Sequence, residues 1–328
     1  MRVPAKKSVA AFLCALVCAV PAQASGDLLF LEVQGIFGYS TGTDSEVWHS
    51  AGEHEPMQKN SVGFDYVRKF SGSRGDWATA ALQFRLAYDD SDDNPEVQLY
   101  NAYFKAKTAL GDFWLGHNRV AFGLASYWDT HADLLGDLTM RGVSFDRDWG
   151  IGYAYDTAFG NVATSLTTGT GMGIRTYGNW LAGARAAYGV LNYDNYTTGI
   201  SLQFGRVLDV MGYEVMNRDP AEIWLFAWDG AWNFDNFEQK IELDVGQRAH
   251  APLYALLYRF GVIPDADERW KAELQASFVR ENHDDAWLAG ACISRRVTSD
   301  LTLRFMISHN FETDENLFVG QFYYYLPV

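Results

Sequence analysis

The last twelve residues of the chain, Leu317 to Val328, alternate between two sets of side chains, as one β-strand with two different faces does. One face is apolar and rich in aromatic residues: Phe318, Phe322, Tyr324, Leu326 and Val328. A strand of this length with a lipid-compatible face is typical of transmembrane β-barrels. Because residues 1–24 also have the pattern of an export signal, the sequence predicts a barrel in a membrane outside the cytoplasm.

The first 24 residues contain the three parts of a secretory signal peptide. These parts are a basic start at Arg2, Lys6 and Lys7, an apolar stretch over 8–20, and a small-residue cleavage site at Ala22, Gln23 and Ala24. The apolar stretch is shorter than the about 20 residues that a membrane-spanning helix needs. We therefore expect cleavage after residue 24 and a single outer-membrane β-barrel domain over 25–328.

The charge and the cysteines of the exported chain exclude two classes of protein. Without the three basic residues of the signal, 23 basic residues remain against 41 acidic ones, a net charge of −18. This charge would repel the phosphates of nucleic acids, so we expect no nucleic-acid partner. Cys292 is the one cysteine that remains after cleavage, which excludes a disulfide within the chain.

Long runs of period-two alternation recur along the sequence. They include residues 78–88, 100–107, 237–245, 270–278 and 301–308, in which every second side chain is apolar. Such runs approach the 9–11 residues that a tilted strand needs to cross a bilayer. Hydrophobic residues make up 48% of the chain, a composition that would also fit a soluble secreted β-sandwich. Its strands are shorter, usually about 5–6 residues, so the run length favours the membrane barrel.

We predict an all-β fold, a transmembrane, antiparallel, up-and-down β-barrel of about sixteen strands, within a range of about 14–18. The expected strands are 28–41, 61–71, 76–89, 96–108, 111–118, 149–156, 161–169, 181–192, 195–206, 221–233, 236–247, 251–261, 269–281, 286–297, 299–311 and 315–328. With the N-terminus in the periplasm, short turns such as 109–110 lie on the periplasmic side. Longer connections such as 119–148 and 207–220 then lie outside the cell.

The polar faces of these strands should line the interior of the barrel. Strands of the first half bring basic side chains to that face: Arg85, Lys105, Lys107 and Arg185. Strands of the second half bring carboxylates, mixed with Lys240, Lys271 and Arg304: Glu238, Glu242, Asp244 and Glu273. In a water-filled pore such charges need no burial partner and act on permeating ions. The alternative is that they form cross-strand pairs without a role in transport.

The longest connection, 119–148, is the most informative one for function. Asp129, Asp133 and Asp137 recur at every fourth residue, which would place three carboxylates on one face of a short helix. Its apolar face would consist of Leu134, Leu135 and Leu138. A helix folded inward would narrow the pore and set its carboxylates opposite the basic strand residues. A helix that stays outside would be a lid with a solvated acidic face, and both arrangements fit the sequence.

An export signal, about sixteen alternating strands, a long third outer loop and an aromatic C-terminal strand together resemble Gram-negative outer-membrane porins. The stretch GHNRVAFGL, residues 116–124, is similar to segments of the group that includes phosphate-selective porins. The resemblance implies a trimeric passive diffusion channel that contacts outer-membrane lipid, lipopolysaccharide and the barrel-assembly machinery. It also implies that the third loop forms the constriction. The residues concerned would be Asp129, Asp133 and Asp137 in the loop, and Arg85, Lys105 and Lys107 in the wall.

We therefore expect a porin of the bacterial outer membrane for small hydrophilic solutes or ions, without a cofactor or metal. The alternative is a structural or partner-dependent barrel without an open pore. We do not expect an enzyme, because Ser308 and His309 are neighbours on one strand and so point to opposite faces. The net charge and the lack of a dense basic ladder argue against an anion-selective channel.

Overall fold

The computed structural model describes residues 26–50, 58–73, 75–89, 94–211 and 214–328, and the predicted signal peptide (1–24) lies outside these residues. The strands are β1 (Asp27–Ser40), β2 (Ser45–Val47), β3 (Asn60–Gly72), β4 (Gly75–Asp89), β5 (Asn94–Thr108), β6 (Gly111–Arg119), β7 (Arg147–Asp156), β8 (Gly160–Thr167), β9 (Trp180–Tyr188), β10 (Tyr196–Met211), β11 (Glu214–Phe234), β12 (Phe237–Arg248), β13 (Ala251–Val262), β14 (Trp270–Glu281), β15 (Asp284–Arg296), β16 (Leu301–Asn310) and β17 (Glu315–Pro327). The helical turns are η1 (Leu124–Ser126), η2 (Thr139–Arg141) and α2 (Leu191–Asp194).

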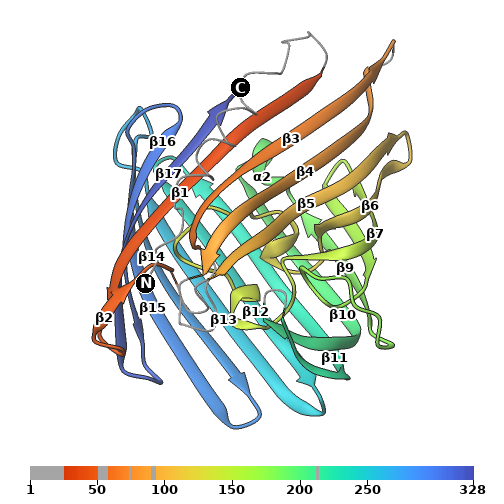
Figure 1. The fold of residues 1–328 in the computed structure, drawn as a ribbon. Helices are drawn as coiled ribbons and strands as arrows, with labels where there is room; N and C mark the ends of the chain where they lie inside the picture. The colour runs from red at the N-terminus through yellow and green to blue at the C-terminus, as the bar shows by residue number, and fades with distance from the viewer. Residues whose placement is uncertain (1–25, 51–57, 74, 90–93, 212–213) are drawn as a thin grey trace, which may run out of the picture.

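The strands form one antiparallel sheet that closes on itself (Figure 1). Closure occurs at β1, which pairs with β3 on one side and with β17 on the other, from Phe30 opposite Pro327 to Ser40 opposite Leu317. Within the described residues sixteen strands form the wall. The seventeenth, the short β2, lies in the connection from β1 to β3 and pairs with the last residues of β1. The predicted sixteen-stranded antiparallel barrel is confirmed, and each predicted span corresponds to one wall strand.

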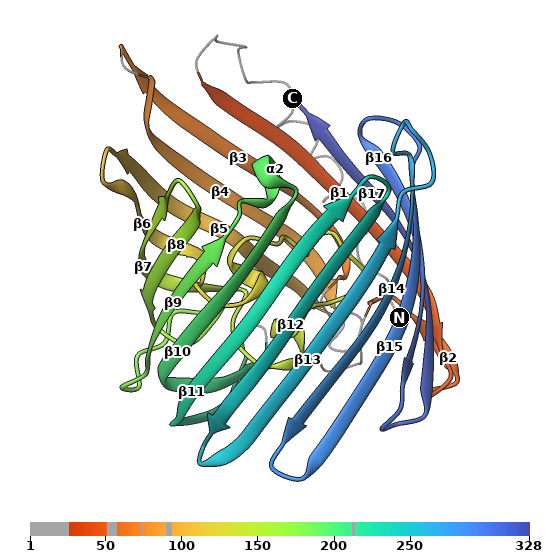
Figure 2. The same ribbon diagram turned by 180° about the vertical axis from the view of Figure 1, so that it is seen from behind.

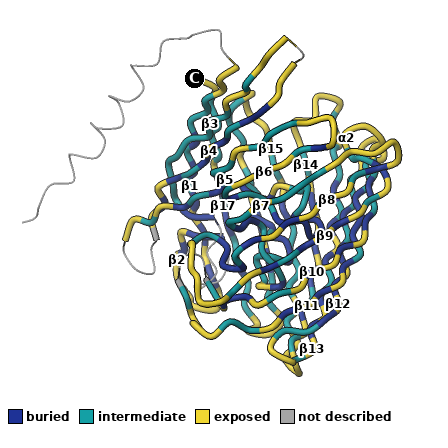
Figure 3. Tube along the Cα trace, turned by 90° about the vertical axis from the view of Figure 1, so that its right-hand side faces the viewer, coloured by how far each residue is buried: buried dark blue, intermediate teal, exposed yellow. Residues whose placement is uncertain are grey.

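Burial alternates residue by residue along the wall strands (Figure 3). On β12, Lys240, Glu242 and Asp244 are buried and point inward, whereas Leu243 and Val245 are exposed on the outer face. A wall that buries charges and exposes large apolar side chains is turned inside out relative to a soluble protein. Among the described residues, no helix is long and apolar enough to cross a membrane.

Both ends of the barrel chain lie at the same rim, since the start of β1 is paired with the end of β17. Figure 1 shows this rim at the top, with the C-terminus and α2 close to it, and β2 at the opposite end. If the N-terminus is periplasmic, the connections 120–146 and 168–179 enter from the outer rim. The view from behind in Figure 2 shows the long strands β10 to β15 in front.

The predicted outer loop 207–220 is wrong, because β10 and β11 continue through most of it as a two-stranded ribbon. Neighbouring strands leave the ribbon early: β9 pairs with β10 up to Arg206, and β12 pairs with β11 only from Ile223. Within the described residues, the far part of the ribbon therefore has no neighbouring strand on either side. An edge without a neighbour accommodates Pro220, which has no amide hydrogen to donate, and the register shifts between Val207 and Val210.

The alternation on β5 also differs from the expectation. A register shift at Gln83 and Phe84 of β4, which face Asn101 and Leu99 of β5, leaves Tyr100 as an extra residue. Tyr100 is consequently buried in the interior and not placed on the outer face with Ala102 and Phe104. Its neighbour Asn101 is half-buried and also points inward, where it accepts a hydrogen bond from Arg147. A β-bulge of this kind re-aims one side chain, and a strict alternation of the sequence does not reveal it.

Candidate functional site: the inner loop

Residues 120–146, which connect β6 to β7 and are called the inner loop below, fold into the barrel. Figures 1 and 2 show this segment in yellow inside the ring of strands from both sides. At its start, the amide of Gly123 donates to the hydroxyl of Ser201 on β10 (3.1 Å), and the amide of Leu124 donates to the carboxylate of Glu242 on β12 (3.1 Å). The inward alternative for this connection is confirmed.

The middle of the inner loop reaches the opposite wall. His131 Nε2 donates to the carboxylate of Glu32 on β1, with N···O distances of 2.8 and 2.9 Å. The side-chain amide of Gln58 donates to the carbonyl of His131 (2.6 Å), and that of Gln321 on β17 donates to the carbonyl of Ala132 (3.2 Å). The loop therefore spans the interior between β10–β12 and the β17–β1 seam.

Two apolar clusters fix the loop to these walls. The larger one joins loop residues to inward side chains of β9 to β14: Val120, Phe122, Leu124, Leu138, Val143, Leu181, Val207, Ile223, Leu225, Ala227, Leu253, Ala255, Leu257 and Val279. The smaller one contains Leu134 and Leu135 of the loop with Ile36, Val47, Cys292, Met306, Leu317 and Val319. The expected apolar face of the loop thus exists but is split between opposite walls. Each buried Leu, Val or Phe contributes on the order of 1.5–3 kcal/mol to the docking.

Aromatic residues of the loop cover two arginines of the wall. Arg185 forms a bidentate pair with Asp229 (2.6 and 2.9 Å) and lies 4.5 Å from the ring centre of Tyr127. Arg259 lies 4.2 Å from the ring centre of Trp128. Guanidinium groups stack well on aromatic faces. Burial and the nearby charge of Asp229 raise the pKa of the Tyr127 hydroxyl, which donates to Asp229 (3.1 Å).

The expected helix over the three loop aspartates is wrong. Residues 129–137 form turns and bends, and the flanking helical turns η1 and η2 are three residues each. The reason is that wall side chains, and not helical amides, satisfy the loop carbonyls. Arg259 donates to the carbonyl of Leu135 (2.5 Å), and Gln275 donates to that of Gly136 (2.8 Å). Backbone groups bonded in this way are not free to form a helix.

The three aspartates have three different settings. Asp129 pairs with Arg119 and with Arg147, whereas Asp133 pairs with Arg259 (3.1 Å). Burial alone would raise the pKa of Asp129, but the two guanidinium groups more than offset this and hold the pKa well below its ordinary range. Asp137 is buried and accepts a hydrogen bond from the amide of Thr139 at the start of η2, so its carboxylate is not exposed in the interior.

The predicted basic wall is not one continuous surface. Arg85 is fully buried and donates to Gln58 (3.0 Å) and Gln98 (2.8 Å) beside the ring of Tyr100. Arg185 is buried against Asp229, as described above. Lys105 and Lys107 lie next to the turn between β5 and β6, where Lys105 is 3.7 Å from Asp112. Their place is therefore near the rim at which β1 starts and β17 ends, and not at the inner loop.

The predicted acidic wall lies on the inner face of β12 and β14. Glu242 and Asp244 are buried beneath the inner loop. Glu238 and Glu273 both approach Lys271, at 2.7 and 3.0 Å. The alternation of the sequence placed all four side chains on the correct face, but it could not show which of them the loop covers.

Several residues that hold the loop in place were not foreseen from the sequence. Glu32, Gln58, Tyr100, His131 and Arg259 are all buried and all contact the loop or belong to it. Glu32 and His131 are 99 positions apart in the chain. A hydrogen bond over such a separation leaves no local pattern, although a charged residue on an inward strand position, such as Glu32 or Arg259, does indicate a partner inside the barrel.

Comparison with known structures agrees with this architecture. A loop-deletion mutant of OmpT, an outer membrane protein of Vibrio cholerae, matches with a TM-score of 0.65 and 11% identity over 92% of this chain and 100% of that one. Salmonella typhi OmpF matches with a TM-score of 0.64 and 11% identity, over 94% and 99% of the chains. The anion-selective porin from Comamonas acidovorans matches with a TM-score of 0.63 and 12% identity, over 93% and 100%.

The fold is that of the outer-membrane porins. No protein-family model matches the chain, and no curated protein matches it in sequence. At identities of 11% and 12% these likenesses establish the fold alone. Together with the closed wall and its apolar outer face, a fold of this kind places the protein in a bacterial outer membrane.

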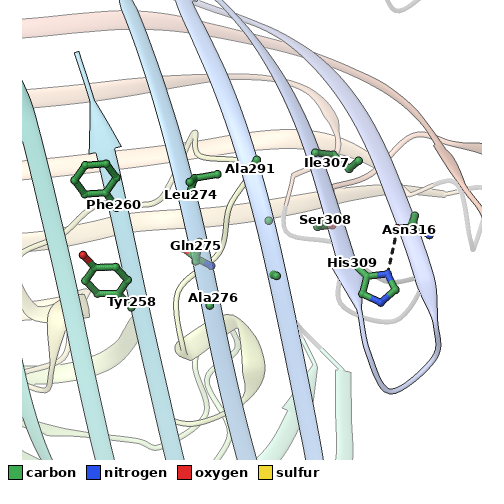
Figure 4. Close-up of a pocket in the computed structure, with 12 residues that line it drawn as sticks. Tyr258, Phe260, Leu274, Gln275, Ala276, Ala291, Ile307, Ser308, His309 and Asn316 are labelled. Atoms are coloured by element: carbon green, nitrogen blue, oxygen red, sulfur yellow. Dashed lines mark hydrogen bonds between the residues drawn. The ribbon is translucent and has the colours of Figure 1, made fainter. Parts of the chain in front are cut away.

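A groove of about 760 Å³ lies on the outer face of β13 to β17 (Figure 4). Small side chains, among them Ala276 and Ala291, lie between larger apolar ones such as Leu274 and Ile307, and the residues that line it include no Asp, Glu, Lys or Arg. At its edge His309 Nδ1 donates to Asn316 Oδ1 (3.1 Å). The groove is a shallow part of the lipid-facing wall, so the interior remains the candidate site.

Proposed function

We propose that this protein is a porin, a passive diffusion channel for small hydrophilic solutes or ions, in which the inner loop forms the constriction. Carboxylates of the loop, Asp129 and Asp133, keep water-exposed surface deep inside a closed barrel, and this observation carries the proposal. Both carboxylates are paired with arginines, but a sealed core would also have to cover them. Their exposure supports a hydrated route past the loop, along which fixed charges lower the barrier for polar solutes.

The rest of the proposal follows the porin resemblance. The channel would have no catalytic chemistry and no energy source, and three copies would assemble in the membrane. Outer-membrane lipid and lipopolysaccharide would surround the trimer, and the barrel-assembly machinery would insert each chain.

A second function, a barrel closed by its own loop, is favoured by a different observation. Glu32, Arg85 and Gln58 have no exposed surface where the loop meets the seam, and apolar clusters hold the loop on two sides. A barrel fixed in this state would be a structural shell, or would open only when a partner displaces the loop.

Conductance in a planar lipid bilayer distinguishes the two functions. We expect the detergent-purified protein to insert and to conduct in steps that occur in multiples of three, as a trimeric porin does. Circular dichroism of the same sample verifies that the barrel is folded. A folded protein that inserts into the bilayer but does not conduct would contradict the porin and support the closed barrel.

A further inference from the structure

In two of the ion pairs that link carboxylates of the inner loop to arginines, the two partners differ in exposure. Arg147 and Asp129 approach to 3.3 Å, and the arginine side chain is 2% exposed whereas the aspartate is 48% exposed. Arg259 and Asp133 approach to 3.1 Å, with 2% and 27% exposure. In both pairs the cation is covered by protein and the carboxylate keeps exposed surface.

The groups that bury Arg147 and Arg259 also accept their hydrogen bonds or lie against the faces of their guanidinium groups. Arg147 donates to Asn101 (3.1 Å) and lies 5.7 Å from the ring centre of Tyr100. Arg259 is stacked on Trp128 and donates to Gln275 (2.7 Å) as well as to the carbonyl of Leu135. A guanidinium group whose donors and faces are occupied in this way has little contact with a passing ion. These arginines hold the loop, and their charge is screened from the route.

Several other cations of the interior are also covered by protein. Arg85 and Arg185 of the predicted basic wall are buried. Lys240 is less exposed than its partner Glu238. Among the cations that keep more exposure, Lys271 lies between Glu238 and Glu273, and Arg119 lies against Asp129. Arg304 on β16 is half-buried and donates to Gln321 (2.9 Å).

From this asymmetry we infer that the channel prefers cations and positively charged solutes, with Asp129 and Asp133 as the residues that determine the preference. The inference rests on the proposed porin function and names its substrate class. A permeating ion meets the negative end of each ion pair first, because the positive end is behind protein. Oriented pairs of this kind produce a negative potential along a narrow, low-dielectric route.

Two further properties support the preference. The guanidinium groups of Arg119 and Arg147 keep the pKa of Asp129 well below its usual range, so its charge persists at every physiological pH. The net charge of −15 of the whole sequence has the same sign. Long-range attraction of cations to the mouth of the barrel therefore acts in the same direction as the loop carboxylates.

The test is the reversal potential of the reconstituted full-length protein in a KCl gradient. The proteins compared are the wild type, D129N, D133N and the double variant, with D129E as the charge-conserving variant. D267N is the matched control, because Asp267 is an exposed carboxylate in the turn between β13 and β14. We expect a K⁺/Cl⁻ permeability ratio above unity that falls by about twofold or more in the double variant. D267N should keep the wild-type ratio, and the ratio of D129E should lie closer to that of the wild type than the ratio of D129N does.

The possible outcomes separate this inference from the function on which it rests. A wild type that conducts but prefers chloride overturns the inference and leaves the porin intact. A ratio that is the same in the double variant as in the wild type also overturns the role of Asp129 and Asp133. A folded protein that does not conduct overturns the porin itself, and the inference with it.

Discussion

Asp137 shows how the setting of one residue can reverse what its sequence position indicates. It was predicted as one of three pore carboxylates, yet it is 2% exposed. Its Oδ1 accepts hydrogen bonds from the amides of Thr139 (3.0 Å) and Met140 (3.3 Å). Its Oδ2 has no hydrogen-bond partner among the described residues. Burial, and then the charge of Asp146, raise the pKa of Asp137 from 3.8 to about 6.

This raised pKa predicts a pH dependence of stability with a definite sign. The folded protein binds the proton of Asp137 more tightly than the unfolded chain, so the protein gains stability below about pH 4 and loses this gain by about pH 6. Asp137→Asn keeps one acceptor oxygen and removes the titration. As the pH rises from about 4 to about 7, the free energy of unfolding should fall less in the variant than in the wild type. The difference between the two decreases should be at most roughly 3 kcal/mol.

Urea unfolding in detergent, followed by tryptophan fluorescence at several pH values, measures this difference. D267N, which removes an exposed carboxylate, is the control and should follow the wild-type profile. Identical pH profiles of the wild type and D137N would show that Asp137 does not titrate in this range in the folded protein.

At the scale of elements, the strands were predictable and the inner loop was predictable only in part. Strand length and period two follow from bilayer thickness and from the pleat, which act on every wall strand alike. The loop was identified by its length, its three carboxylates and its leucines. Its path, however, depends on contacts such as Glu32 with His131, which join residues 99 positions apart. The ribbon of β10 and β11 was missed because Pro220 is typical of a loop, except on a free edge.

Gly123 is the position where docking of the inner loop depends on the absence of a side chain. It has φ = 53° and ψ = −152°, a backbone conformation that costs other residues about 1–3 kcal/mol. A Cβ there would lie 1.7 Å from Glu242 Oε1, while the other carboxylate oxygen accepts the amide of Leu124 (3.1 Å). Gly123→Ala should therefore release the start of the loop from β12 without opening the wall.

Hydrogen exchange of the loop amides measures this release. We expect faster exchange around residues 123–128 in G123A and unchanged exchange in the wall strands. Gly173→Ala is the matched control, since its Cβ would have only the guanidinium group of Arg175 nearby, at 3.6 Å. Exchange as slow in G123A as in the wild type would mean that the loop does not need the close approach to Glu242.

At the scale of the whole molecule, the barrel has its polar core inside and its apolar surface outside. The seam between β1 and β17 completes the ring, so all wall strands are paired on both sides along the membrane-spanning part. In lipid this closure is required, because an unpaired edge would leave amide and carbonyl groups without partners. In water the same outer face, with residues such as Leu243 and Phe305 exposed, would promote aggregation.

The outer face therefore predicts a destabilisation that depends on depth in the membrane. Leu243 lies in the middle of β12 and points outward, and Phe237 lies on the same face at the end of the strand. Leu243→Arg should destabilise the protein in lipid vesicles by about 2–4 kcal/mol, whereas an arginine near the interface costs about 0–1 kcal/mol. For Phe237→Arg, loss of the stacking on Phe260 (5.8 Å) adds a small cost. Urea unfolding in vesicles measures the destabilisation by each substitution. Equal destabilisation by both would contradict the placement of β12 across the bilayer, because in water both positions are on an exposed surface where a charge is tolerated.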